Sequence, residues 1–325
     1  MNNRRNLVIA LGAAALGVSL SSLAQAPAAK LVRIGLLGPG TASGDVNWAA
    51  ALVANLRDLG YVEGTNLSVE SRWADGKNDR LAELAAELVR LDVDVIVTFQ
   101  TPAALAAKQA TKTIPIVMVT AADPVATGLI ASLARPGGNV TGMSGATSEL
   151  TAKNLELIRQ ILPSAMRVAV LANAADPFAK SFLEQNQLAA RTLGIELQVV
   201  MVRGDGPLDA AFDEIAKARA SAVIVQPSLP YKRAVELAVQ HRLATSAPGQ
   251  GFADAGGLLA YTQSIADRDR QAAVYVDKIL KGAKPADLPV RQPAKFEMVI
   301  NLQTARRLGL KIPPGILARA DRVIE

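Results

Sequence analysis

Residues 94–120 read DVIVTFQTPAALAAKQATKTIPIVMVT, and this stretch decides the fold class. Asp94 to Phe99 and Ile116 to Thr120 are short apolar runs typical of buried strands, and the alanine-rich segment between them favours a helix. A strand, a helix and a second strand in this order form a right-handed crossover between parallel neighbours. The stretch therefore predicts an α/β fold built on a parallel sheet.

The same alternation of strand and helix extends to both sides of this stretch. Further strands are predicted at 31–37, 66–73, 167–171, 195–202 and 222–225, and further helices at 48–59, 81–91, 149–162, 177–193, 207–219 and 230–243. A chain of 325 residues is too long for one ordinary core. We therefore expect two lobes, each a parallel sheet covered by helices on both faces, with a first boundary in the turn-rich segment 135–145.

Residues 1–28 have the pattern of a signal peptide. Arg4 and Arg5 form a positive start, residues 7–20 are apolar, and Ala24-Gln25-Ala26 fits the small-x-small rule for cleavage. Ala26-Pro27-Ala28 is a second candidate cleavage site. The apolar run is short for a membrane span, which needs roughly 20 residues. We therefore expect secretion to the periplasm through a cleaved signal peptide.

Composition and missing motifs exclude most kinds of chemistry. The chain has no cysteine and one histidine, His241, which excludes disulfides, thiol catalysis, a lipid-anchoring cysteine and a multi-histidine metal site. Gly38-Pro39-Gly40 is not completed to a dinucleotide fingerprint, and no phosphate-binding loop or nucleophile elbow occurs. The net charge of +6 is spread along the chain, which argues against nucleic-acid binding. We expect no catalytic residues, no metal and no cofactor.

One local pattern recurs where predicted strands end. A polar residue followed by proline occurs at Thr101-Pro102, Asp123-Pro124 and Asp176-Pro177. Thr or Asp is suited to cap a helix, and proline at the first helical position needs no donor. Such helix starts line the carboxyl edge of a parallel sheet, where ligands bind and anions are attracted. Each pattern is also that of an ordinary helix cap, and Trp48, after the first strand-end loop, is a further candidate for this crevice.

Longer motifs make the prediction specific, and their order resembles that of a family of ABC transporter substrate-binding proteins that includes tryptophan- and tyrosine-import binding proteins. The motifs are DVIVT at 94–98, TPAA at 101–104, TIPIV at 113–117, DPV at 123–125, SLARPGGNVTG at 132–142, AVYVDKILKGAKPADLPV at 273–290, KFEMVINL at 295–302, IPP at 312–314 and LARAD at 317–321. They extend over nearly the whole chain after the signal peptide.

This resemblance implies the type I periplasmic-binding-protein fold, in which three crossing segments join two Rossmann-like lobes and the ligand lies in the cleft. Lobe one would comprise 29–143 and 254–290, and lobe two 144–253 and 291–325. The family's cleft loops match strand ends of this sequence. The ligand-binding residues expected on that basis are Gly40, Thr41, Gln100, Thr101, Ala122, Asp123, Asn173, Asp176, Ser228 and Gln250. Gln250 lies in a stretch, 247–252, that departs from the family pattern, where an aromatic residue or an arginine is common.

The resemblance implies capture of a solute without chemistry, by a monomer that closes on its ligand and docks on an ABC permease in the inner membrane. We expect a small ligand with a carboxylate. The leading candidate is an amino acid with an aromatic or branched side chain. Thr101 and the N–H groups after it are candidates for the carboxylate, and Asp123 or Asp176 for the ammonium. The alternatives are an aromatic acid without an amine, a sensory protein that presents its closed form to a membrane receptor and, more remotely, a secreted enzyme.

The segment 1–28 gives a direct prediction. The mature protein recovered from outside the cytoplasm should begin at Pro27 or at Ala29, because the peptidase cleaves after a small residue. N-terminal sequencing measures this. A chain that starts at Met1, or that stays in the membrane at full length, would contradict the prediction.

Overall fold

The computed structural model describes residues 31–145, 148–203, 206–249 and 251–325, and no side-chain positions at 42–47 or 148–149. Val32–Glu325 form one compact unit. The predicted signal peptide at 1–28 lies outside the described residues. Among the residues that are described, no helix has the length and apolar character needed to cross a membrane.

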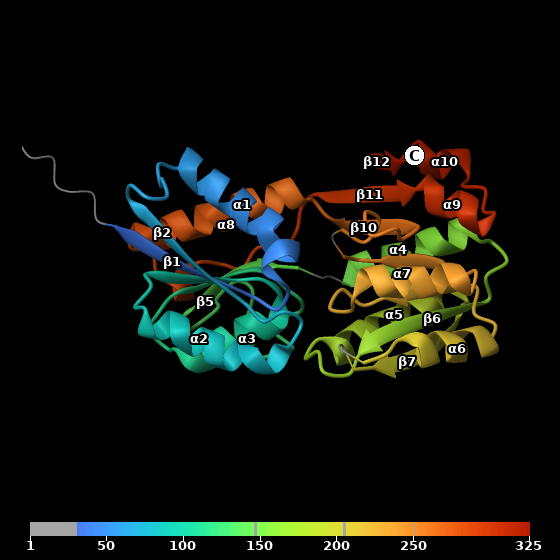
Figure 1. Cartoon of the computed structure of the whole chain (residues 1–325), viewed down its shortest axis with the longest axis horizontal. Coiled ribbons are helices and arrows are strands. Elements are labelled where there is room, and N and C mark those ends of the chain that lie inside the picture. Colours follow the sequence, from blue (N-terminus) through green and yellow to red (C-terminus); the bar gives the residue numbers. More distant parts are fainter. Residues whose placement is uncertain (1–30, 146–147, 204–205, 250) are drawn as a thin grey trace, which may run out of the picture. The chain divides into compact units, whose positions relative to one another are not determined.

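The first sheet contains the stretch that decided the fold class. Its strand order is β2 (Leu67–Trp73), β1 (Val32–Gly38), β3 (Val95–Thr98), β4 (Ile116–Ala121) and β5 (Val140–Ser144), and every pairing is parallel. Helices α1 (Ala42–Asp58) and α8 (Ile265–Leu280), far apart in the sequence, lie side by side on one face (Figure 1). The other face carries α2 (Leu81–Arg90) and α3 (Gln100–Ala110). The predicted α/β class is confirmed here.

The second sheet is larger. Its strand order is β12 (Arg322–Ile324), β11 (Phe296–Asn301), β10 (Leu259–Gln263), β9 (Ala244–Ala247), β8 (Ala222–Val225), β6 (Arg167–Asn173) and β7 (Glu196–Val202), and only the β10–β11 pairing is antiparallel. Its helices are α4 (Ser148–Ile161), α5 (Ala179–Leu193), α6 (Asp209–Lys217), α7 (Tyr231–Gln240), α9 (Leu302–Leu308) and α10 (Pro314–Leu317). Two sheets with helices on both faces match the predicted architecture.

The strands are apolar on both sides because both faces of each sheet are covered. In β1, Ile34 and Leu36 pack with α1 and α8, whereas Leu37 packs with α2 and α3. In β6, Val168 and Val170 belong to one core and Ala169 and Leu171 to another. Side chains that alternate between two cores produce a continuous apolar run in the sequence. This is why residues 94–120 predict a buried parallel sheet.

The chain passes between the sheets after β5, between β10 and α8, and before β11. These crossings lie together, since Ser264 N donates to Lys295 O at 2.8 Å and Ser144 N donates to Arg291 O at 2.9 Å. We call 32–144 with 265–291 lobe one, and 148–263 with 296–325 lobe two.

The second crossing lies later in the chain than the sequence suggested. Residues 254–263 were expected in lobe one, but Leu259–Gln263 pair with β9 and β11 in the sheet of lobe two. Leu259 and Ala260 fill the two cores of that sheet. A short apolar run predicts a strand, but its choice of sheet depends on these tertiary contacts.

Asn154 on α4 fixes this strand in place. Its side chain is fully buried; Nδ2 donates to Leu150 O and Tyr261 O, both at 2.8 Å. Its Oδ1 accepts from Ser246 Oγ at 2.6 Å and from Tyr261 N at 3.2 Å. One amide therefore connects α4, β9 and β10.

Asn154→Ala should lower the free energy of unfolding by about 2–4 kcal/mol, because it leaves several buried polar groups without partners. Urea denaturation of the mature protein measures this. Asn55→Ala is a matched control, since the Asn55 side chain makes one hydrogen bond, to Ala51 O, on a partly exposed part of α1. Equal losses in the two variants would contradict a special role for Asn154.

Candidate ligand-binding site

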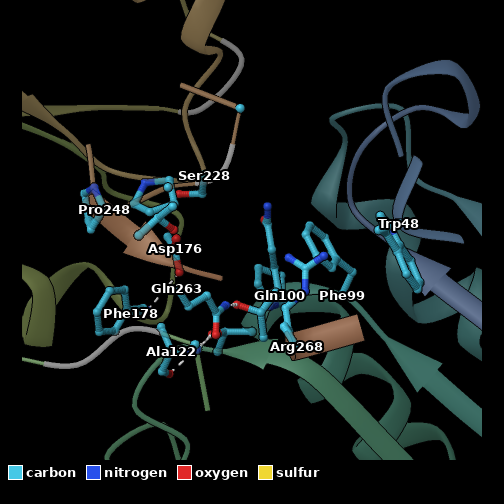
Figure 2. Close-up of a pocket in the computed structure, with 18 of the residues that line it drawn as sticks. Trp48, Phe99, Gln100, Ala122, Asp176, Phe178, Ser228, Pro248, Gln263 and Arg268 are labelled. Carbon is cyan, nitrogen blue, oxygen red and sulfur yellow. Dashed lines mark hydrogen bonds between the residues drawn. The ribbon is translucent and has the colours of Figure 1, made fainter. Parts of the chain in front are cut away.

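A cavity of about 360 Å³ lies between the two lobes, a size suited to a small molecule. Figure 2 shows Trp48, Phe99, Gln100 and Arg268 on one side of it and Asp176, Phe178 and Pro248 on the other. Among the described residues, its lining is formed by Trp48, Phe99, Gln100, Thr101, Pro102, Thr120, Ala122, Gly145, Asp176, Phe178, Pro227, Ser228, Tyr231, Pro248, Gly249, Gly251, Thr262, Gln263 and Arg268.

Most lining residues follow the carboxyl end of a parallel strand. Phe99 and Gln100 follow β3, Ala122 follows β4, and Asp176 comes shortly after β6. In lobe two the residues after β8 and β9 complete the same edge. Ligands of open α/β sheets bind at this edge, because the strands end there together and the helices begin there. Gln100 has a positive φ of 66°, a strained conformation of the kind that gathers at functional sites.

Aromatic rings form much of the wall in lobe one. Trp48 stacks on Phe99 with ring centroids 5.1 Å apart and an interplanar angle of 12°, and Trp73 packs edge-on against Trp48. Trp48 is buried, and its indole Nε1 has no hydrogen-bond partner among the described residues. This wall offers a flat apolar surface with a polar atom nearby, which suits a ring-bearing ligand.

Lobe two contributes Tyr231 in a closely packed corner. Its ring packs edge-on against Phe252 with centroids 4.9 Å apart, and burial raises the pKa of the Tyr231 hydroxyl. That hydroxyl has no partner among the described residues. A Cβ at Gly249 would overlap the hydroxyl, so only glycine fits there. Glycine at 249 thus leaves the space that the Tyr231 hydroxyl occupies at the cavity wall.

Asp176 is the acidic group among the described residues of the cavity wall and is only 8% exposed. Its Oδ1 accepts from Phe178 N at 2.9 Å and its Oδ2 accepts from Gln226 Nε2 at 2.8 Å. Burial raises the pKa of Asp176, while Ser228, the Phe178 N–H and Gln226 act in the opposite direction. Ser228 Oγ is close enough to affect this pKa but lies outside hydrogen-bond geometry. A buried carboxylate held in this way is suited to a cationic ligand group.

Several residues predicted from strand ends do line the cavity, namely Gln100, Thr101, Ala122, Asp176 and Ser228. Thr101, however, is not a helix N-cap: α3 begins at Gln100 after Phe99. The Thr101 hydroxyl accepts from Ala122 N at 2.9 Å and so joins the start of α3 to the loop after β4. The predicted cap is wrong because the helix begins one residue before the threonine.

The other predicted residues lie elsewhere. Gly40 O accepts from Asp75 N at 2.7 Å; neither Gly40 nor the exposed Thr41 is in the cavity lining. Asn173 Oδ1 accepts from Ala175 N at 3.0 Å within its own loop. Gln250 lies outside the described residues.

Asp123 bonds to the opposite lobe. Its Oδ2 accepts from Ser181 Oγ on α5 at 2.6 Å, and its Oδ1 accepts from Ala126 N in a turn. No helix follows Pro124, so the predicted helix cap at Asp123 is wrong. Ser181 in turn accepts from Gln185 Nε2 at 3.1 Å. A second contact near the crossings joins Gln263 Nε2 to Thr120 Oγ1 at 3.1 Å.

The strand-end pattern did not identify Phe99, Phe178, Tyr231, Gln263 or Arg268. Phe99 and Phe178 lie one and two positions from predicted residues, so a wider window at each strand end would have included them. Gln263 and Arg268 lie on either side of the second crossing. The position of that crossing in the sequence would have identified them. Among the described residues, no group of three His, Cys, Asp or Glu side chains is arranged to hold a metal.

The chain is similar to known proteins over most of its length. Residues 47–324 match the family model described as ABC transporter substrate binding protein. A tyrosine-binding protein of Clostridioides difficile is 27% identical over 263 residues, covering 79% of this chain and 74% of that protein.

Solved structures share the fold of this chain. A conserved domain protein from Vibrio cholerae has a TM-score of 0.85 at 28% identity and covers 90% of this chain and 100% of its own. An ABC domain from Streptococcus pneumonia, in complex with L-Trp, has a TM-score of 0.84 at 24% identity and covers 90% and 99%, which supports the fold. The predicted resemblance is confirmed. This chain belongs to the family of ABC transporter substrate-binding proteins, which are not enzymes.

Proposed function

We propose that this chain is the periplasmic component of an ABC importer and that it captures an amino acid with an aromatic side chain. The observation that carries the proposal is the buried Asp176 carboxylate in a cavity whose facing wall is the Trp48–Phe99 stack. The 27% identical relative that binds tyrosine supports an aromatic amino acid. The order of residues 1–28 supports export, and the family supports a permease partner.

The ammonium group of the ligand would pair with Asp176. The carboxylate is already oriented by Phe178 N and Gln226, so little freedom is lost when a ligand binds. In a partly desolvated cavity a charge-assisted hydrogen bond is stronger than a neutral one. Asp123, the other candidate from the sequence, is bonded to Ser181 and lies outside the cavity lining.

The aromatic side chain of the ligand would lie against Trp48 and Phe99. Aromatic pairs add roughly 0.5–1.5 kcal/mol to the energy of area burial. The carboxyl end of the ligand would then face lobe one, where Gln100 and Thr101 start α3. The first N–H groups of a helix have no acceptor within it and attract anions. A ligand held in this way contacts both lobes and favours their closure.

Asp176→Asn should weaken binding of the preferred amino acid about 10- to 100-fold, because the ammonium loses its charged partner while the packing is kept. For the wild type, affinity should also fall as the pH drops through the raised pKa of Asp176, since only the carboxylate pairs with an ammonium. Calorimetry with a panel of amino acids, on protein unfolded and refolded to remove bound ligand, measures both effects.

Asp209→Asn is the matched control, because Asp209 is exposed and pairs with Arg233 outside the cavity. It should bind as the wild type does. Unchanged binding by Asp176→Asn would contradict the pairing with ammonium. If aromatic acids without an amine bind more tightly than amino acids do, the ligand class is aromatic acids and not amino acids.

The Asp123–Ser181 bond is expected to act as a latch between the lobes, and it leads to a separate prediction. Ser181→Ala should weaken every ligand by the same factor, about tenfold, because the bond joins the lobes without touching the ligand. Small-angle scattering should also show a smaller radius of gyration on ligand addition, with more ligand needed in the variant.

Ser132→Ala serves as control, since Ser132 Oγ donates to Arg135 O within an exposed turn of lobe one. If the loss of affinity in Ser181→Ala differed strongly between ligands, Ser181 would contact the ligand directly. If the affinities equalled those of the wild type, the Asp123–Ser181 bond would not act as a latch.

A further inference from the structure

Arg268 is a buried cation on the cavity wall that the strand-end pattern did not identify. It lies in the first turns of α8, directly after the second crossing, and is 2% exposed. It nonetheless lines the cavity, and Figure 2 shows its guanidinium beside Phe99 and Gln100, on the side opposite Asp176. Its charge therefore faces the space in which a ligand would lie.

Asp269 and Phe99 are among the neighbours that orient the guanidinium. Nε and Nη2 donate to the same oxygen, Asp269 Oδ1, at 2.7 and 2.5 Å. The Cζ atom lies 5.3 Å from the centroid of the Phe99 ring, within the range of a cation–π contact. Phe99 stacks on Trp48 as well, so the cation and the aromatic wall form one unit.

This arrangement is costly if it serves stability alone. Burial lowers the pKa of Arg268 and raises that of Asp269, which shows that both charges are desolvated. Asp269 Oδ2 is buried and has no hydrogen-bond partner among the described residues. A buried ion pair with one oxygen left over is weak as a stabilising element, and apolar side chains of similar volume often do as well.

We propose that Arg268 binds the carboxylate of the ligand, so that the cavity recognises a zwitterion. This inference rests on the proposed function, in which Asp176 binds the ammonium. Lobe one then supplies the positive charge and lobe two the negative charge. The two charges of an α-amino acid are adjacent, so such a ligand would connect Arg268 to Asp176 across the cavity and draw the lobes together.

Selection among ligands follows from this arrangement. An amino-acid amide keeps the ammonium and the aromatic ring but loses the negative charge. It leaves the buried guanidinium without an anionic partner from the ligand, which a closed site penalises. The wild type should therefore bind tyrosine about 10- to 100-fold more tightly than tyrosine amide.

Calorimetry of ligand-stripped wild type, R268Q and R268K with tyrosine and tyrosine amide tests this. R268Q should lose most of its affinity for tyrosine but little for the amide, so that the preference disappears. R268K, which keeps the charge but not the planar fork, should keep part of the preference. R270Q is the matched control, since Arg270 is exposed on the same helix and pairs with Asp267; its preference should equal that of the wild type.

The possible failures are distinguishable. Equal binding of tyrosine and its amide by the wild type overturns the role of Arg268 and leaves Asp176 and the proposed function intact, and this result needs no variant that folds. If R268Q loses affinity for tyrosine and for tyrosine amide by the same factor, and R268K restores no preference, Arg268 has a purely structural role. This result also overturns the proposal. If no amino acid of a wider panel binds the wild type, the proposed function itself fails, and with it this inference.

Discussion

Parallel pairing of strands is the constraint on which the site depends. Parallel neighbours end at the same edge of a sheet, so the residues after β3 and β4 lie together in lobe one, and those after β6, β8 and β9 lie together in lobe two. The crossings near Ser144, Ser264 and Lys295 are mutually bonded, and they hold the two edges opposite each other. A cavity with walls from both lobes is the consequence.

Within this frame the two walls differ in charge and in chemistry. Lobe one presents Arg268 with the Trp48–Phe99 stack, and lobe two presents Asp176 with Tyr231. Each charged side chain is almost fully buried and is oriented by neighbours before any ligand arrives. A ligand that satisfies both charges gains from both lobes, and one that lacks either charge gains from a single lobe. Selectivity and closure then have the same physical origin, because differential affinity for the closed form drives a population shift.

The contact between the lobes outside the cavity lining, Asp123–Ser181, would concern the stability of the closed form and not the choice of ligand. In the proposed function, the Asp123–Ser181 bond would change the stability of the closed form for every ligand equally, whereas Asp176 and Arg268 would change the relative affinity of different ligands. Affinity and selectivity can therefore vary separately in this fold. Asp123, which the sequence offered as a ligand residue, bonds to the opposite lobe outside the cavity lining, whereas Asp176 lines the cavity.

The sequence alone determined the layered α/β fold, because apolar runs such as 94–99 and 116–120 record strands buried on both faces. It also determined that residues at strand ends would gather at the carboxyl edges of the two sheets, Gln100 and Thr101 in lobe one and Asp176 in lobe two. Tertiary structure decided what local pattern does not encode. Which of the two sheets the strand 259–263 joins depends on Asn154 and on two cores contributed by distant segments. Arg268 enters the cavity only because α8 returns to lobe one after that strand, so its role depends on where the chain crosses between the sheets.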